Sequence, residues 1–396
     1  MPDTPVMDRV VRRSLERGVP IGVHFDVTYR CNERCVHCYL DHEDYGELET
    51  SEVKRILKEL AEAGALMLTF SGGEVFLRKD FFELVEFARK LHFDISLKSN
   101  GLLITQERAA RLRELGVRRI QVSIYSADAS VHDRITKVRG SLERTVLAIR
   151  FLKAQGLQVK IACPLMKQNA GGLPALQALA EELNVPYVID MTITPKLDGD
   201  MSVLSMRNSA EDLLPVLLHP KLNPAADASD GLQGAAKLTG SAVSSGIEGD
   251  AYRDIPCSAG HNTCYISPYG DVYPCVQMPI AAGNLREQDF GEIWRHSPQM
   301  KRVRAVRERD LPVCSSCSIR QFCERCPGLA HMEGGDLLGA YERACELAEM
   351  KARLAGMENP VSAWNAQPRK MQVMAHASEI PSPLVQIGRM EARPRA

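Results

Sequence analysis

The chain has 396 residues and a formal net charge of −1, with 45% hydrophobic and 25% charged residues. This balance is typical of a globular protein, and the length is enough for one large domain and a smaller one. The near-zero charge gives no reason to expect nucleic acid or an anionic membrane as a partner. No apolar run is long enough to span a membrane, and the N-terminus lacks the apolar core of a signal peptide. We therefore expect a cytoplasmic protein.

After an N-terminal segment, residues 1–20, the sequence alternates from 21 to 195 between apolar strand-like runs and stretches with helical periodicity. In SEVKRILKELAEAG, for example, Val53, Ile56 and Leu57 recur on one helical face. Repeated strand–helix units predict an α/β fold, a partial (β/α)6 barrel of the TIM type with its helices outside. The strand candidates are GVHFDVTY, ALMLTFS, FDISLKSN, RIQVSIYS, LQVKIAC and YVIDMTIT.

The alternation within these strands predicts a polar barrel interior. In the first strand, Val23 and Phe25 would face the helices, whereas His24 and Asp26 would face the lumen. A polar lumen indicates a cavity for a cofactor and a substrate; the alternative is that some of its side chains make only structural hydrogen bonds. The same alternation places in the lumen Thr28, Lys98, Asn100, Gln121, Ser123, Tyr125, Asp190 and Thr192.

The remaining chain changes character three times. Residues 196–250 are rich in Gly, Ala, Ser and Asp and are interpreted as a linker or bridging region. Residues 251–350 contain most of the cysteines and are expected to form a second, smaller domain. Residues 351–396 lack clear periodicity and are expected to form a flexible tail.

Twelve cysteines need an explanation in a cytoplasmic chain, because that compartment keeps thiols reduced. Eleven of them fall in two groups, which favours metal or iron–sulfur ligation over disulfides. The first group, Cys31, Cys35 and Cys38, has the spacing C-x3-C-x2-C directly after the first strand, where barrel enzymes place catalysis. Structural zinc prefers four closed ligands. Three thiolates instead suit a cubane with one iron left open to a small molecule.

This motif, in this place, resembles the radical S-adenosylmethionine (SAM) superfamily over residues 20–195. The resemblance implies that the open iron of a 4Fe–4S cluster binds the amino and carboxylate groups of SAM. An electron from the cluster would then cleave the sulfonium and release a 5′-deoxyadenosyl radical, which abstracts hydrogen from the substrate. The chain departs from the family in having His37, where an aromatic residue often precedes the third cysteine.

The resemblance also implies SAM contacts at the ends of the following strands. In the motif SGGE, two glycines let the backbone approach a ligand, and Glu74 could accept from the SAM ammonium. Arg139 could pair with the SAM carboxylate. The alternatives are a turn at Asn100 and a solvated surface charge at Arg139. The expected cofactor-binding residues are Gly72, Gly73, Glu74, Asn100, Ser123 and Arg139.

The second cysteine group resembles the SPASM extension of radical SAM enzymes, with Gly270-x4-Cys275 followed by paired cysteines and a final lone one. It departs from that pattern in having two residues, not three, between Cys323 and Cys326. Eight thiolates suffice for two auxiliary 4Fe–4S clusters, although two zinc sites would use the same ligands. The resemblance implies one cluster on Cys257, Cys264, Cys275 and Cys326, and another on Cys314, Cys317, Cys323 and Cys345.

The twelfth cysteine, Cys163, ends the fifth strand. By parity it belongs to the face that packs on the helices. We therefore expect a buried structural thiol rather than a ligand.

The family resemblance implies an enzyme that modifies a ribosomally made peptide or protein. The alternatives are a radical enzyme acting on a tetrapyrrole or another small molecule, and a non-catalytic zinc or electron-transfer protein. Only about 20 residues precede the first strand, which is short for a fused peptide-recognition domain. We therefore expect a separate leader-peptide-binding protein, with flavodoxin or ferredoxin as the electron donor.

Overall fold

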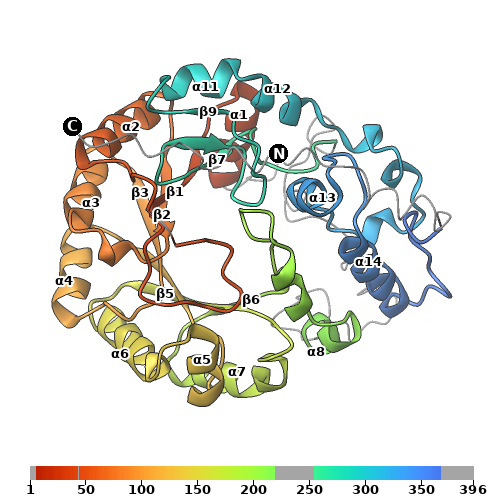
Figure 1. Cartoon of the computed structure of the whole chain (residues 1–396), viewed down its shortest axis with the longest axis horizontal. Helices are drawn as coiled ribbons and strands as arrows, with labels where there is room; N and C mark the ends of the chain where they lie inside the picture. The colour runs from red at the N-terminus through yellow and green to blue at the C-terminus, as the bar shows by residue number, and fades with distance from the viewer. Residues whose placement is uncertain (1–5, 43, 219–253, 367–396) are drawn as a thin grey trace.

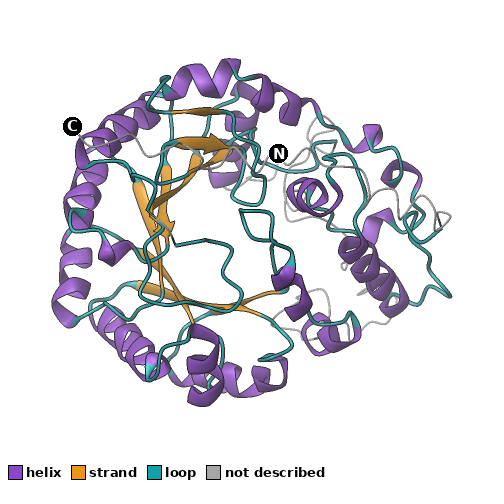
Figure 2. Cartoon of the chain, in the orientation of Figure 1, coloured by secondary structure: helices purple, strands orange, loops and turns teal. Residues whose placement is uncertain are grey.

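The computed structural model describes residues 6–42, 44–218 and 254–366. Within these ranges, nine strands form one sheet in the order β6-β5-β4-β3-β2-β1-β7-β8-β9. The sheet curves into an open arc with helices along its outer side (Figures 1 and 2). The strands are β1 (Gly22–Thr28), β2 (Met67–Gly72), β3 (Asp94–Ser99), β4 (Arg119–Ser123), β5 (Gln158–Pro164), β6 (Tyr187–Asp190), β7 (Thr263–Ile266), β8 (Asp271–Tyr273) and β9 (Gly283–Asn284).

The helices of the first half follow the strands one by one, which confirms the predicted partial barrel. Adjacent strands from β1 to β6 pair in parallel, as the connecting helices require. The helices of this half are α1 (Val6–Arg17), α2 (Thr50–Glu62), α3 (Phe81–Lys90), α4 (Gln106–Glu114), α5 (Ala129–Thr136), α6 (Ser141–Ala154) and α7 (Leu173–Glu182).

The main core lies between the sheet and this outer layer of helices. The apolar face of α2 buries Val53, Ile56 and Leu57 completely, because it packs against the side of β1 and β2 that carries Phe25 and Phe70. The opposite face of the same strands is polar and is turned to the inside of the arc, as the alternation predicted.

The C-terminal cysteine-rich region extends the barrel sheet, which the predicted domain division did not anticipate. Strand β7 pairs in parallel with β1, with Val23 opposite Cys264. Strands β8 and β9 then continue the sheet as antiparallel neighbours. The other α-helices of the described residues are α8 (Leu214–Leu217), α11 (Phe290–His296), α12 (Pro298–Ala305), α13 (Pro327–Gly334) and α14 (Glu342–Leu354).

Two boundary predictions need correction or fall partly outside the structure. Residues 351–366 are not a loose tail: α14 continues to Leu354, and Ser362 and Trp364 are buried. In the predicted linker, Arg207 forms an ion pair with Glu333 of α13, so residues 196–218 are tied to the C-terminal region. Residues 219–250 of the linker and 367–396 of the tail lie outside the described residues.

Candidate active site

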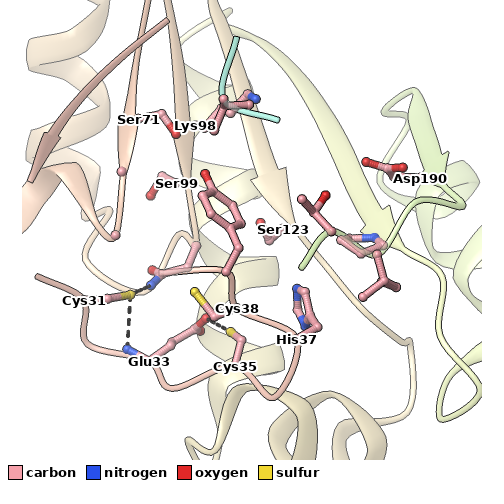
Figure 3. Close-up of a pocket in the computed structure, with 18 of the residues that line it drawn as sticks. Cys31, Glu33, Cys35, His37, Cys38, Ser71, Lys98, Ser99, Ser123 and Asp190 are labelled. Carbon is pink, nitrogen blue, oxygen red and sulfur yellow. Dashed lines mark hydrogen bonds between the residues drawn. The ribbon is translucent and has the colours of Figure 1, made fainter. Parts of the chain in front are cut away.

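A cavity of about 290 Å³ lies inside the arc, where the carboxyl ends of the barrel strands meet. Cys31, Cys35 and Cys38 line one end of it, and Lys98 and Asp190 lie toward the other (Figure 3). Parallel strands present their carboxyl ends at one edge, so side chains far apart in sequence converge there. The cavity is therefore the place where the predicted cluster motif and the polar lumen meet.

The cysteine loop is held in place by hydrogen bonds on both sides. Arg34 and Val36 donate their backbone N–H groups to carbonyls of Thr136 and Ile135 at the end of α5, over 3.1 and 3.0 Å. Within the loop, the N–H of Cys38 donates to the carbonyl of Cys35 over 3.0 Å. This anchoring turns all three thiols toward one cavity.

The surroundings of the thiols fit cluster ligation. The backbone N–H of Glu33 and the side-chain amide of Asn100 donate to the sulfur of Cys31, over 3.4 and 3.7 Å. Donors of this kind stabilise thiolate ligands and tune a cluster's potential. Burial raises the pKa of the Cys31 thiol to about 12 and of Cys38 to about 11, so metal binding would have to displace these protons.

Two further groups contact Cys35. Its sulfur lies 3.2 Å from a carboxylate oxygen of Glu33 and 3.6 Å from the hydroxyl of Tyr125. Burial raises the pKa of Glu33 to about 7, against the opposing effect of its hydrogen bond from Cys35. The ring of His37, the residue that departs from the family pattern, packs edge-on against Tyr125 at 4.9 Å between centroids. His37 therefore occupies the pocket wall as an aromatic ring would.

The two glycines of the SGGE motif line the cavity, but their close approach is to the protein itself. A Cβ at Gly72 would lie 2.0 Å from the carbonyl oxygen of Thr28, and one at Gly73 would lie 2.3 Å from that of Arg30. Gly72 also has φ = +129°, which side chains rarely adopt. The glycines thus let the end of β2 pack directly against the start of the cysteine loop.

The structure does not place Glu74 where a SAM ammonium could reach it, which corrects the prediction. Its carboxylate is completely buried and does not line the cavity. It accepts from the hydroxyl of Ser99 at 2.9 Å and from the backbone N–H groups of Asn100 and Phe76, at 2.9 and 3.3 Å. Burial raises the pKa of Glu74 to about 7 despite these donors. Glu74 therefore holds the end of β3, and with it Asn100.

The other expected SAM contacts differ in whether they line the cavity. Asn100 and Ser123 line the cavity, as predicted from their strand ends. Arg139 does not: its side chain is exposed in the turn between α5 and α6, away from the residues that line the cavity. The prediction for Arg139 was wrong because its side chain is a solvated surface charge in this turn, the alternative that the sequence left open.

Sequence reasoning missed a buried hydrogen-bonded chain beneath the cavity. His24, which lines the cavity, contacts one oxygen of the buried carboxylate of Asp26 at 3.0 Å. The hydroxyl of Tyr265 donates to the other oxygen over 2.9 Å and lies 2.6 Å from the hydroxyl of Tyr29. Tyr265 belongs to β7, so only the β1–β7 pairing brings it here. This network fixes the orientation of His24 toward the cavity.

Four C-terminal cysteines, Cys314, Cys317, Cys323 and Cys345, line one small cavity; we call them the second auxiliary set. Ser362, Ala363 and Trp364 also line it, and the N–H of Ala363 donates to the sulfur of Cys317 over 3.4 Å. The structure thus brings together the four cysteines that the SPASM resemblance grouped. Residues beyond α14, predicted to be a tail, complete their surroundings.

Three other cysteines, Cys257, Cys275 and Cys326, lie near one another beside the main cavity; we call them the first auxiliary set. The predicted fourth member, Cys264, is apart from them in the main core between sheet and helices, and this contradicts its assignment. Its parity explains the difference: Tyr265 faces the lumen, so its neighbour Cys264 must face the helices. Cys163 is likewise buried in that core, as expected.

No three His, Cys, Asp or Glu side chains within residues 6–42, 44–218 and 254–366 are arranged to hold a single metal ion. A cubane places several iron and sulfide atoms between its ligands, so its thiolates stand further apart than those around one ion. In the same ranges, no helix is long and apolar enough to cross a membrane.

Comparison with known proteins supports the interpretation of both cysteine regions. The sequence model of the radical SAM superfamily matches residues 25–176, and that of the SPASM iron–sulfur cluster-binding domain matches residues 257–318. The AdoMet-dependent heme synthase of Methanosarcina barkeri is 30% identical over 81% of this chain and 95% of its own. The mycofactocin maturase MftC of Mycobacterium tuberculosis is 31% identical over 78% of each chain.

Solved structures agree on the fold. Streptococcus suis SuiB bound to its precursor peptide SuiA superposes with a TM-score of 0.65 at 18% identity, over 86% of this chain and 80% of SuiB. Native anSMEcpe with bound AdoMet gives 0.62 at 16% identity, over 89% and 98% of the two chains. The chain therefore belongs to the radical SAM superfamily, whose members use SAM and a 4Fe–4S cluster, and it carries a SPASM iron–sulfur cluster-binding region.

Proposed function

We propose that this radical SAM enzyme modifies a peptide or protein by abstracting a hydrogen atom from a residue held beside Lys98. Lys98 is the observation that carries the proposal. It is exposed inside the barrel, lines the cavity, and has no hydrogen bond or ion pair with any described residue. Asp190 and Cys275 feel the charge of its ammonium without a hydrogen bond or ion pair to it, so the ammonium is left to attract a carboxylate of a bound molecule. We assign it to the C-terminal or an acidic side-chain carboxylate of the substrate.

The size and lining of the cavity favour a peptide over a macrocycle. A volume of about 290 Å³ must also receive part of SAM, which leaves room for a side chain or a chain end. Polar side chains of Asp190, Thr192 and Gln277 also line the cavity. Desolvation raises the pKa of Asp190, against the opposing effects of Thr192 and of the charge of Lys98. Its carboxylate can accept a hydrogen bond from a substrate amide or hydroxyl.

In the proposed mechanism, Cys31, Cys35 and Cys38 would hold the cluster, and the backbone N–H of Glu33 and the side-chain amide of Asn100 donate hydrogen bonds to the sulfur of Cys31. When bound, the cluster and SAM would supply the 5′-deoxyadenosyl radical. Gly72, Gly73, Asn100 and Ser123 line the cavity and would lie against SAM. Lys98 orients the substrate, and His24, held by Asp26, presents its ring to the cavity.

Two kinds of relative bear on the substrate. The mycofactocin maturase and the PqqA peptide cyclase of Rhodopseudomonas palustris, at 29% identity over 85% of this chain, support a peptide. A small-molecule substrate is the second candidate, favoured by the heme synthase, which this chain matches over 95% of that protein's length. A propionate would satisfy Lys98 as a peptide carboxylate does. A leader-peptide-binding protein and a flavodoxin or ferredoxin donor complete the peptide proposal.

The test offers both substrates to the same enzyme. Anaerobic protein is supplied with SAM and dithionite, then with either the short peptides encoded beside its gene or iron-coproporphyrin. We expect a peptide, with or without a co-encoded leader-binding protein, to accelerate 5′-deoxyadenosine formation and to change mass. A modified tetrapyrrole with every peptide unchanged would overturn the proposal in favour of the small-molecule candidate.

A further inference from the structure

The position of Cys264 removes it from the first auxiliary set. It lies opposite Val23 in the β1–β7 register and is 3% exposed within the main core. In a parallel pair, opposite residues share a face, so Cys264 shares the helix-facing side with Val23. Its electrostatic neighbour is Arg304, not another cysteine. To bind a cluster together with the first auxiliary set, the thiol of Cys264 would have to lie on the other face of the sheet.

The three remaining cysteines converge without it. Cys257 and Cys275 pack against the same cluster, which includes Met278 and Leu337. A Cβ at Gly328 would lie 2.1 Å from the carbonyl oxygen of Gln277, so the start of α13, directly after Cys326, presses on the segment directly after Cys275. The shared packing brings the thiols of Cys257 and Cys275 together, and the contact between Gly328 and Gln277 brings Cys326 toward Cys275.

The first auxiliary set borders the main cavity. Val276 and Gln277, which follow Cys275, both line that cavity. The side-chain oxygen of Gln277 lies 3.9 Å from the sulfur of Cys326, and its amide nitrogen donates to the hydroxyl of Thr194, another cavity residue, over 3.2 Å. A position of the cluster that no cysteine holds is therefore next to a cavity of about 290 Å³.

The second auxiliary set gives the contrast within the same molecule. Its four cysteines line one small cavity of about 20 Å³, which Trp364 and Ala363 also line. That set meets the four-thiolate requirement of a fully ligated cluster. The first auxiliary set has three thiolates, one fewer than a fully ligated cluster needs, because Cys264 lies on the opposite face of the sheet.

We infer that the first auxiliary cluster is held by three cysteines, Cys257, Cys275 and Cys326, and that its fourth position takes a small anionic donor from the main cavity. Cys264 is a structural residue of the barrel core. The donor class includes a substrate carboxylate, hydroxyl or thiolate. This inference depends on the cluster-binding assignment alone and stands whichever substrate is correct.

Iron content tests the ligand set. The full chain with Cys31, Cys35 and Cys38 replaced by Ala retains only the auxiliary clusters, about eight irons if both are cubanes. In that background, Cys264→Ala should keep the iron and sulfide content and the reduced-state EPR spectrum. Cys257→Ala, the matched variant, should lose one cluster. Loss of a cluster from folded Cys264→Ala would overturn the inference.

A second measurement leaves Cys264 intact and so does not depend on how its variants fold. The same background is reduced and supplied with ¹³C-cyanide, and electron–nuclear hyperfine spectra are recorded. We expect ¹³C coupling to one of the two auxiliary signals, which disappears with Cys257→Ala and persists with Cys345→Ala. Absence of coupling to either signal would show that both clusters are fully ligated and would overturn the inference.

Discussion

The two cysteine-rich regions of this chain are assembled in different ways. The three cysteines after β1 lie within one short loop, and the hydrogen bonds of that loop to α5 aim all of them at one cavity. The C-terminal cysteines come from separate segments, from the loop before β7 to α14. Local spacing therefore identifies the first site, whereas only tertiary packing sorts the others into sets.

The two regions also differ in what they leave open. The cavity beside Cys31 is lined by polar groups from several strands and has room for ligands. The second auxiliary set lines a cavity of only about 20 Å³ beside the buried ring of Trp364. A site with room for ligands suits chemistry on a bound molecule, and one without it suits electron transfer or structural support.

Replacing Cys31, Cys35 and Cys38 with Ala should abolish 5′-deoxyadenosine formation, because SAM loses its cluster. Iron should fall by about four from about twelve per chain, leaving the auxiliary clusters. Chromatographic assay of the nucleoside and iron analysis measure both. Cys163→Ala, which removes a buried thiol outside every set, is the control and should keep both values. Nucleoside formation by the triple variant would place SAM cleavage elsewhere.

Lys98→Ala should raise the KM for the substrate roughly tenfold to hundredfold, because a charge-assisted hydrogen bond contributes about 1.5–3 kcal/mol. Iron content should not change. The matched control is Lys160→Ala, because Lys160 is also exposed on a nearby strand of the sheet but does not line the cavity. Steady-state kinetics with the substrate decide the point, and equal KM values for the two variants would remove Lys98 from substrate binding.

Glu74→Gln should lower the free energy of unfolding by about 1–3 kcal/mol. The NH₂ group of the new amide cannot accept the hydrogen bonds that the carboxylate of Glu74 now accepts. The substitution should also slow SAM cleavage a few-fold by loosening Asn100. Denaturant unfolding and the nucleoside assay measure the two effects. Glu114→Gln, at an exposed position of α4, should change neither. A SAM-binding defect with unchanged stability would instead restore Glu74 as a direct contact.

Trp364→Ala should speed the loss of iron from the second auxiliary set to a chelator, roughly threefold, because it uncovers a protected cavity. SAM cleavage should be nearly unaffected. Val361→Ala, whose side chain is 51% exposed, is the control. Identical rates of iron release would mean that Trp364 does not cover the cluster.

Features that depend on neighbouring residues were predictable from the sequence. Strand alternation correctly placed His24, Lys98, Asn100 and Asp190 in the lumen, and the C-x3-C-x2-C spacing located the first site. Features that depend on the β1–β7 pairing were not. Tyr265 reaches Asp26 from 239 residues away, and the same pairing turns Cys264 into the core. Glu74 and Arg139 were misplaced because a motif does not show whether a side chain turns inward or outward.

The central claim is that the Cys31–Cys35–Cys38 loop holds a cluster to which SAM binds directly in this cavity. The most direct measurement is the hyperfine spectrum of the reduced protein with SAM carrying a ¹⁵N-labelled amino group. The account predicts ¹⁵N coupling to one cluster signal, absent from the variant that lacks these three cysteines. Fully loaded protein that binds SAM without any ¹⁵N coupling would contradict it.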